Sequence, residues 1–358
     1  MPVECVTISR LKVPLKTPYK LSLAEIRAFD TVLVEARNGD GRIGLGEATV
    51  LTGYTHETID QCWELAAELA QRIIGRPFED AKAIADESRH RAPFTVTAVV
   101  TAIEMLQGSS FLTRSAPERV PLLALVHSTD ADGLSREIDT LIEQHYATLK
   151  VKVGFDVESD LTRVRLIQQL VDGRARLRID ANQGYNRDDA RHFAKSLNPE
   201  GIELLEQTCA AGDWKAAQAV AEVADVPLML DESIYDLSDV DRAADLGVAQ
   251  YIKFKLMKAG GLADLAKALD HIRACGMEPV LGNGVACDVG CWMEACMMPG
   301  YVNNAGEMNG FLKTRSPLFQ EPLIVEHDAI KLEPAFVPKL DQAMITQYTE
   351  ATQQFGSQ

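Results

Sequence analysis

The sequence predicts an α/β protein, with a (β/α)₈-type barrel preceded by an α+β capping domain of antiparallel strands and helices. From about residue 120 onward, short aliphatic runs alternate with helical patterns of roughly a dozen residues, at near-constant spacing. Eight such strand–helix units indicate a closed parallel barrel. An open doubly wound sheet would need a glycine-rich phosphate turn after its first strand, and residues 124–133 (ALVHSTDADG) offer none.

The first 118 residues are predicted to form the capping domain. Three stretches alternate apolar and polar side chains as antiparallel strands do, and they are 5–15, 30–38 and 42–50. The NGDG sequence at 38–41 is typical of a hairpin turn. Helical patterns follow at about 56–74, 79–90 and 95–112. The segment from about 321 to 358 contains no further strand–helix unit, so we expect it to complete this domain.

Residues 119–320 are predicted to form the barrel, with each strand identified by a short aliphatic run. The runs are 120–126, 148–153, 175–179, 202–205, 226–230, 250–256, 277–281 and 300–306. Helical segments such as 160–171 and 262–276 lie between them, and Gly276 is typical of a helix C-cap.

Composition narrows the function classes. The chain has 52 acidic and 36 basic residues and a net charge of −16, which argues against a nucleic-acid partner. No stretch reaches the ~18 apolar residues of a membrane span, and the start of the chain has no apolar leader pattern. The seven cysteines form no CxxC pair, and Cys287, Cys291 and Cys296 match no common zinc spacing. We therefore expect a cytoplasmic protein with reduced thiols.

Charged side chains recur at the ends of successive predicted strands. In such a barrel, the carboxyl ends of the strands build the active site. Each of five successive units has a charged group there, and the second strand has two; the set is Lys150 and Lys152, Asp180, Glu206, Asp231 and Lys255. On a single strand, two alternating lysines would indicate an exposed face, and a single aspartate would indicate a helix N-cap. The recurrence at one height of the barrel favours a common site.

The mixture of carboxylates and lysines predicts a chemistry. Three carboxylates aimed at one axis repel one another unless a cation joins them, and an all-oxygen set suits Mg²⁺. A lysine beside a metal ion and a second lysine would have a lowered pKa and could act as a base near pH 7. Metal-assisted removal of a proton alpha to a carboxylate, through an enediolate, fits this set.

The motifs KVKVG, DAN, LLEQ, LDES and KLMKAGG, with GLGEA at 44–48, resemble the muconate lactonizing enzyme subgroup of the enolase superfamily. The resemblance covers essentially the whole chain. It implies that Lys152 and Lys255 are the acid/base pair and that Lys150 orients the substrate carboxylate and lowers the pKa of Lys152. It implies Mg²⁺ as cofactor, a small-molecule carboxylate as substrate and a homo-oligomeric assembly. The implied Mg²⁺ ligands are Asp180, Glu206 and Asp231.

Other residues are expected around this centre. Asn182 and Glu232 follow the metal ligands and are expected to support them. By resemblance, loops near Lys20 and Tyr54 would close over the substrate. Further substrate contacts are expected after the seventh and eighth strands, from Asn283, Glu307 and Asn309.

The sequence also departs from the family pattern. Thr208 stands where the family usually has proline after the Glu-Gln pair, and mandelate racemase's catalytic histidine has no counterpart near Asn283. Dipeptide epimerases carry two aspartates at the eighth strand, where this chain has Glu307 and Asn309, and a glutamate there looks more like the cycloisomerases. Glu307 could contact substrate or pair with the lysines, and the role of Lys253, deeper than Lys255, stays open.

The leading hypothesis is therefore a Mg²⁺-dependent isomerase. It would be a racemase or epimerase of an N-substituted amino acid or similar compound, or a muconate-type cycloisomerase. A dehydratase of the o-succinylbenzoate synthase type would use the same site. A Schiff-base lysine aldolase is an alternative from another class, but it would not need three convergent carboxylates.

Overall fold

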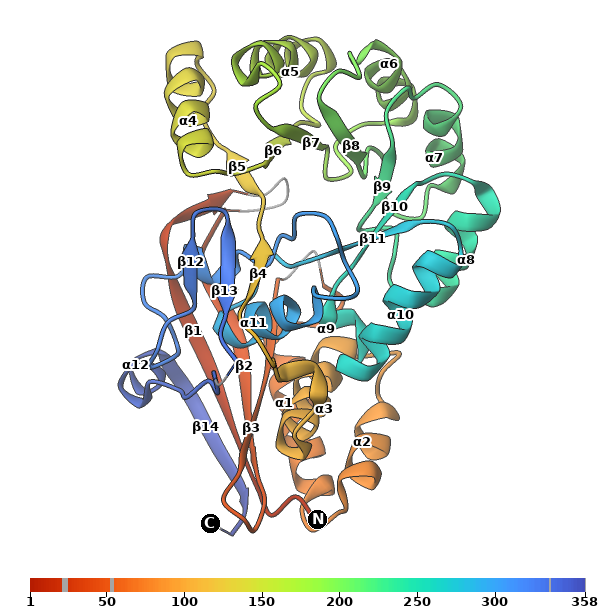
Figure 1. The fold of residues 1–358 in the computed structure, drawn as a ribbon. Coiled ribbons are helices and arrows are strands. Elements are labelled where there is room, and N and C mark those ends of the chain that lie inside the picture. Colours follow the sequence, from red (N-terminus) through yellow and green to blue (C-terminus); the bar gives the residue numbers. More distant parts are fainter. Residues whose placement is uncertain (21–24, 52–54, 335, 358) are drawn as a thin grey trace.

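The computed structural model describes residues 1–20, 25–51, 55–334 and 336–357 (Figure 1). Its N-terminal part is built on an antiparallel sheet with strand order β14-β1-β2-β3. Helices α1 (Ile59–Ile73) and α3 (Pro93–Gln107) pack against this sheet, and α2 (Phe78–Asp86) packs on both helices. The strands are β1 (Cys5–Lys20), β2 (Glu25–Arg37), β3 (Ile43–Val50) and β14 (Thr349–Gly356). The predicted hairpin is confirmed, because Arg37 pairs with Ile43 across the turn.

Glycines allow β3 and α3 to approach each other closely. A Cβ at Gly44 would lie 1.9 Å from the carbonyl oxygen of Ala102, and one at Gly46 would lie 1.8 Å from that of Ala98. Both distances are far below van der Waals contact, so only glycine fits. Helix α3 itself begins at Pro93 and ends before Gly108, which adopts a left-handed conformation. The GLGEA motif therefore serves helix–sheet packing at its two glycines.

The C-terminal part is a parallel half-barrel. Within the described residues it has seven strands in the order β11-β10-β9-β8-β7-β6-β5, and helices cover the outer side of the arc (Figure 1). The strands are β5 (Ala124–Val126), β6 (Thr148–Lys152), β7 (Arg176–Asp180), β8 (Ile202–Glu206), β9 (Leu228–Leu230), β10 (Tyr251–Phe254) and β11 (Glu278–Leu281). The outer helices are α4 (Ala131–Glu143), α5 (Val157–Val171), α6 (Arg187–Ser196), α7 (Trp214–Ala221), α8 (Leu237–Leu246) and α10 (Leu262–Ala274).

The prediction of an eighth strand at 300–306 is wrong for the described chain. This segment does not form a ladder of β-sheet hydrogen bonds with either neighbour. It makes isolated backbone hydrogen bonds instead, in which Gly306 N–H donates to Pro121 and the next residue, Glu307, donates to Leu281. The side chain of Asn304 is used as well, donating to the Pro279 carbonyl at 2.9 Å. The segment thus lies between the two end strands of the sheet without extending it.

The first predicted strand, 120–126, is divided in the structure. Its beginning is β4 (Glu118–Pro121), which joins β12 (Ile324–Glu326) and β13 (Ala329–Leu332) in a separate three-stranded sheet. Its end is β5 of the half-barrel. The break follows from a change of partner, since Leu122 N–H donates to Asp328 and Leu123 N–H donates to Gly306.

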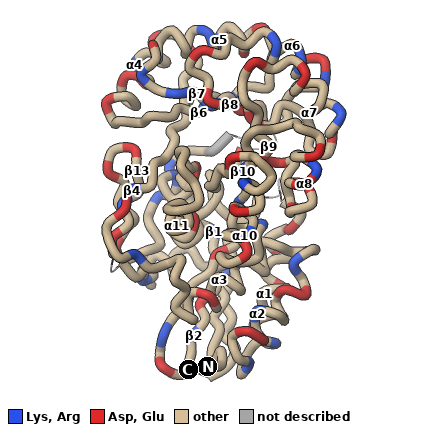
Figure 2. The backbone as a smooth tube through the Cα atoms, turned by 45° about the vertical axis from the view of Figure 1, so that its right-hand side comes forward, with Lys and Arg blue, Asp and Glu red and all other residues tan. Residues whose placement is uncertain are grey.

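The remaining elements connect the two parts. They are η1 (Ser110–Leu112), α9 (Leu256–Ala259), α11 (Asp288–Met297), η2 (Gly310–Lys313) and α12 (Gln342–Tyr348). Because β14 pairs with β1 along its length, we propose that the last residues belong to the capping domain and that the boundary lies near residue 118. Among the described residues, no helix combines the length and the apolar character needed to cross a membrane. Acidic and basic residues are interspersed over the outer helices (Figure 2).

Candidate active site

The strands bring the predicted charged residues to one edge of the half-barrel. Lys152, Asp180 and Glu206 are the last residues of β6, β7 and β8, and they are direct neighbours in the strand register. Asp231 and Lys255 immediately follow β9 and β10. Because parallel strands in register share their carboxyl edge, spacing along the chain becomes adjacency in space.

Lys150 lies at the centre of the carboxylates. Its side chain is 1% exposed, and its Nζ lies 2.8 Å from carboxylate oxygens of Asp180, Glu206 and Glu307. Burial alone would lower the pKa of this ammonium group, but the three carboxylates outweigh burial and raise the pKa well above its usual value. Lys150 is therefore held as a cation.

Lys253 is a second buried ammonium in the same cluster. Its Nζ lies 3.1 Å from Glu206 and 3.7 Å from Asp231, and it makes a short ion pair with Glu307. The Glu307 carboxylate thus stands between Lys150 and Lys253, and these cations lower its pKa far below the usual range despite burial. This arrangement explains how Lys253 can be buried, since its three ion-pair partners all carry the opposite charge.

Lys152 and Lys255 lie on the two sides of the carboxylate group. Lys152 Nζ is 2.6 Å from Asp180 and also donates to Asn182. Lys255 Nζ is 2.8 Å from Asp231. Lys152 ends β6 and Lys255 follows β10, with β7, β8 and β9 between them, so the carboxylates lie between the two lysines along the sheet.

The pKa of each carboxyl group in the cluster depends on the charges beside it. Burial would raise the pKa of Asp180, but Lys150 and Lys152 lower it to about 2. Glu206 is the opposite case, because burial and the nearby Asp180 charge raise its pKa. Burial and the charges of Asp231 and Asp180 raise the pKa of Glu232 to about 7. One cluster thus holds carboxylates of quite different proton affinity.

The pKa of Lys255 is raised, whereas the sequence predicts a lowered lysine pKa. Burial would lower the pKa of Lys255, but the carboxylates of Asp231 and Glu232 raise it instead. For Lys255 to be a neutral amine, as expected from the sequence, another cation would have to bind these carboxylates. Only then would burial become the main influence on the pKa of Lys255 and lower it.

The donor set fits a hard divalent cation. Oε2 of Glu206 is buried and accepts no hydrogen bond, although Lys150 lies at 2.8 Å, and the buried Oε2 atom of the half-buried Glu232 accepts none. Together with Asp180 and Asp231 these oxygens form an all-carboxylate set, which is the chemistry that Mg²⁺ prefers. In the described structure the carboxylate oxygens of Asp180, Glu206 and Asp231 do not form one compact group of ligand atoms. The ammonium groups of Lys150 and Lys253 lie among them and contact them instead.

A pocket opens at the strand ends, and both parts of the chain line it. Asn283 and Glu307, which are predicted to contact substrate, are among its lining residues. Asn309 is not among the described lining residues, and its side-chain oxygen lies 3.2 Å from Lys313 Nζ. Tyr54 and the side chain of Lys20 lie outside the described residues. Asn182 donates to Glu232 at 3.1 Å, so these two side chains hold each other in place beside Asp180 and Asp231.

Sequence reasoning missed the apolar wall of the pocket. Phe94 from α3, Leu51 after β3 and Met257 from α9 contribute to it, with Thr49 and Thr55 nearby. Met257 lies within the KLMKAGG motif and could have been found from it. Phe94 and Leu51 carry no local signal, because their position depends on how the two parts of the chain pack.

Comparisons with known proteins agree with this architecture. Residues 4–106 match the model of the mandelate racemase/muconate lactonizing enzyme N-terminal domain, and residues 133–335 match the enolase C-terminal domain-like model. An L-Ala-D/L-Glu epimerase from Clostridium acetobutylicum is 28% identical over 82% of this chain and 83% of its own length.

Two solved structures share the fold. A dipeptide epimerase from Cytophaga hutchinsonii, complexed with Mg and the dipeptide D-Ala-L-Val, has a TM-score of 0.88 at 18% identity, covering 99% of this chain and 100% of its own. Muconate lactonizing enzyme from Pseudomonas fluorescens, complexed with muconolactone, has a TM-score of 0.88 at 22% identity, covering 98% and 99%. With the two domain matches, this chain belongs to the mandelate racemase/muconate lactonizing enzyme family of the enolase superfamily.

Proposed function

We propose that this enolase-superfamily isomerase removes and returns a proton alpha to the carboxylate of a small molecule, with Lys152 and Lys255 as the acid/base pair. The observation that carries the proposal is their placement on opposite sides of one buried group of carboxylates. We propose Mg²⁺ as the cofactor, held by Asp180, Glu206 and Asp231. When bound, Mg²⁺ would stabilise the negative charge that develops on the substrate carboxylate as the proton leaves.

The lysines of the site would have separate roles in this reaction. One lysine, as a neutral amine, takes the alpha proton from one face of the substrate, and the other, as an ammonium, donates a proton to the opposite face. This exchange inverts the carbon, as a racemase or epimerase requires. Lys150 is the cation that would hold the substrate carboxylate, because it is central and permanently charged. Asn182 donates to Glu232, which keeps both side chains in place beside the lysines.

Glu307 favours a substrate without a free ammonium group next to the reacting carbon. Its carboxylate is already paired with Lys150 and Lys253, so little negative charge is left to attract a further cation. The apolar side chains of Phe94, Leu51 and Met257 would contact the uncharged part of the substrate. An N-acylated or otherwise N-substituted amino acid satisfies these conditions.

A muconate-type cycloisomerase is the second candidate, and the glutamate at position 307 favours it. In that reaction the substrate carries carboxylates and no ammonium group, which suits a pocket lined by several lysine ammonium groups. A dehydratase would also fit the two lysines, while a Schiff-base aldolase would leave the three carboxylates without a role. A cytoplasmic location and a homo-oligomer stay predictions from the sequence.

Exchange in D₂O tests the proposal. The enzyme, freed of metal and reloaded with Mg²⁺, is incubated with N-acyl amino acids and with muconate-type diacids, and the alpha proton is followed by NMR. We expect loss of the alpha-proton signal with N-acyl amino acids, abolished by EDTA and restored by Mg²⁺. Turnover of the diacids without such exchange would favour the cycloisomerase. Borohydride trapping of a covalent adduct on Lys255 would support the aldolase and contradict the proposal.

A further inference from the structure

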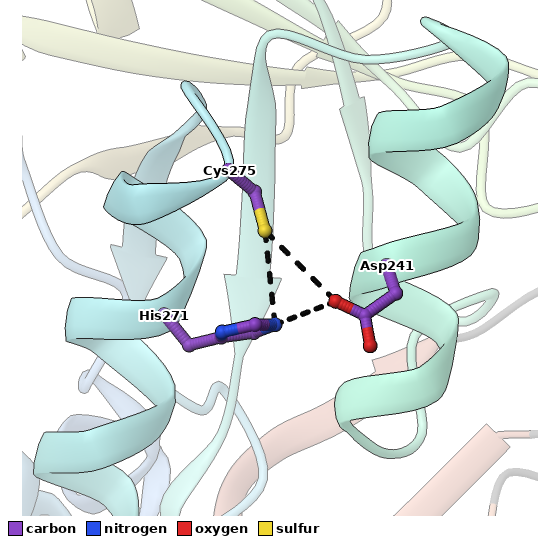
Figure 3. Close-up of side chains that lie close together, drawn as sticks. All are labelled: Asp241, His271 and Cys275. Carbon is purple, nitrogen blue, oxygen red and sulfur yellow. Dashed lines mark hydrogen bonds and ion pairs between the residues drawn. The ribbon is translucent and has the colours of Figure 1, made fainter.

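A second cluster of metal-binding side chains lies on the outer side of the half-barrel, away from the strand ends. Asp241 projects from α8, and His271 and Cys275 project from the end of α10 (Figure 3). Within the described part of the chain, this is the one group of three His, Cys, Asp or Glu ligand atoms lying within 4.8 Å of one another. It shares no residue with the proposed active site.

The three donor atoms converge on one point. His271 Nε2 lies 2.6 Å from Asp241 Oδ1 and 3.7 Å from Cys275 Sγ, and Sγ lies 4.0 Å from the same Oδ1. A tetrahedral zinc ion with bonds of roughly 2.0–2.3 Å holds its donors roughly 3.3–3.6 Å apart. Asp241 is 57% exposed and can retreat from the imidazole to reach that separation. The cluster is therefore close to the size that zinc needs.

The same geometry excludes a nucleophilic triad. In a thiol–imidazole–carboxylate triad, one ring nitrogen takes the thiol proton while the other donates to the carboxylate. Here the thiol and the carboxylate both contact Nε2 of His271. In addition, burial and the charges of Asp241 and Asp245 raise the pKa of the Cys275 thiol, whereas a nucleophilic cysteine needs a lowered pKa. Converging donors suit a cation instead.

A matched pair elsewhere shows what the cysteine adds. His192 on α6 contacts Glu158 on α5 at 2.7 Å, so the chain uses a histidine–carboxylate contact between neighbouring outer helices twice. Four residues after His192 the chain has Ser196, whereas four residues after His271 it has Cys275. The first pair thus has a hydroxyl where the second has a thiol. The second has the soft third ligand that zinc prefers.

We propose that Asp241, His271 and Cys275 bind a zinc-type divalent cation that joins α8 to α10, with water completing the coordination. Binding displaces the thiol proton of Cys275 to solvent and requires the imidazole proton to reside on Nδ1, so no redox partner is needed. The site is independent of the proposed function, because the active-site donors are oxygens that select Mg²⁺.

Cobalt is the probe for this site. Full-length, metal-free protein is first saturated with Mg²⁺ and then titrated with Co²⁺, whose thiolate complexes show a charge-transfer band in the near ultraviolet. We expect one Co²⁺ per chain with this band, displaced by Zn²⁺. The other six cysteines (Cys5, Cys62, Cys209, Cys287, Cys291 and Cys296) are buried, so the band should report Cys275.

Variants decide the assignment. Cys275→Ser should abolish the band, and His271→Ala should weaken Zn²⁺ binding by at least roughly tenfold, the cost of losing even an outer partner of a ligand. His192→Ala is the matched control and should leave binding unchanged. Circular dichroism checks that each variant is folded. A wild-type protein without the band, or a band that persists in Cys275→Ser, would overturn the proposal.

Discussion

Replacing Lys253 with methionine tests how the buried charges are balanced. Methionine has a similar volume but no charge, so Lys253→Met leaves Glu307, Glu206 and Asp231 with one cation fewer. Removing one partner of a buried ion pair costs about 3–5 kcal/mol. Lys150 still lies 2.8 Å from Glu206 and Glu307, so we expect the lower end, a loss of about 3 kcal/mol in unfolding free energy.

The assay is urea unfolding in metal-free buffer, followed by circular dichroism, for a double-mutant cycle. The cycle consists of the wild type, Lys253→Met, Glu307→Gln and the double variant. Because the two side chains form a direct ion pair, we expect a coupling energy of about 1–3 kcal/mol, with the double variant less destabilised than the sum. A Lys253→Met variant as stable as the wild type, with no coupling to Glu307, would refute the reasoning.

Three further predictions concern packing, pH dependence and metal binding. Gly46→Ala should destabilise the protein by about 3 kcal/mol in urea unfolding, because its Cβ would overlap the Ala98 carbonyl. Burial raises the pKa of Asp288 to about 7, above its ordinary 3.8, so the native state binds this proton more tightly and its stabilising effect is lost as pH rises toward 7. Asp288→Asn should therefore flatten the fall in unfolding free energy between pH 4 and pH 7, by up to ~4 kcal/mol. Glu206→Gln should weaken Mg²⁺ binding, measured by calorimetry, by roughly tenfold or more.

Each of these has a control. Gly39→Ala should be tolerated, because its Cβ would meet only the movable side chain of Glu4. Asp288→Asn keeps the acceptor for the Leu318 N–H, so an unchanged pH profile would contradict the assigned pKa and not reflect a lost hydrogen bond. Glu200→Gln, on the exposed loop before β8, should leave Mg²⁺ binding unchanged. Equal affinities for Glu206→Gln and Glu200→Gln would remove Glu206 from the ligand set.

The residues at the strand ends could be predicted because local periodicity fixes which residue ends each strand. Lys152, Asp180 and Glu206 are neighbours in register, as their spacing implied. The role of Lys253 could not be predicted in the same way. Its main partner, Glu307, is 54 residues away and lies on an irregular segment.

Two of the failures have a common physical origin in partners that are distant along the chain. The run 300–306 looks like a strand, yet only Gly306 bonds to the neighbouring segment, at Pro121 and Leu123, and the next residue, Glu307, bonds to Leu281. The pocket wall formed by Phe94 depends on the packing of α3 beside α9. The expected low lysine pKa assumed that a metal occupied the carboxylates, whereas in the structure the lysines themselves do.

The stereochemistry of exchange in single-lysine variants tests the central claim most directly. Each enantiomer of a turned-over N-acyl amino acid is incubated in D₂O with Lys152→Ala or Lys255→Ala, and deuterium at the alpha carbon is measured by NMR. Lysines placed on opposite faces predict that each variant exchanges one enantiomer only, and that the two variants select opposite ones. Exchange of the same enantiomer by both variants would contradict the account.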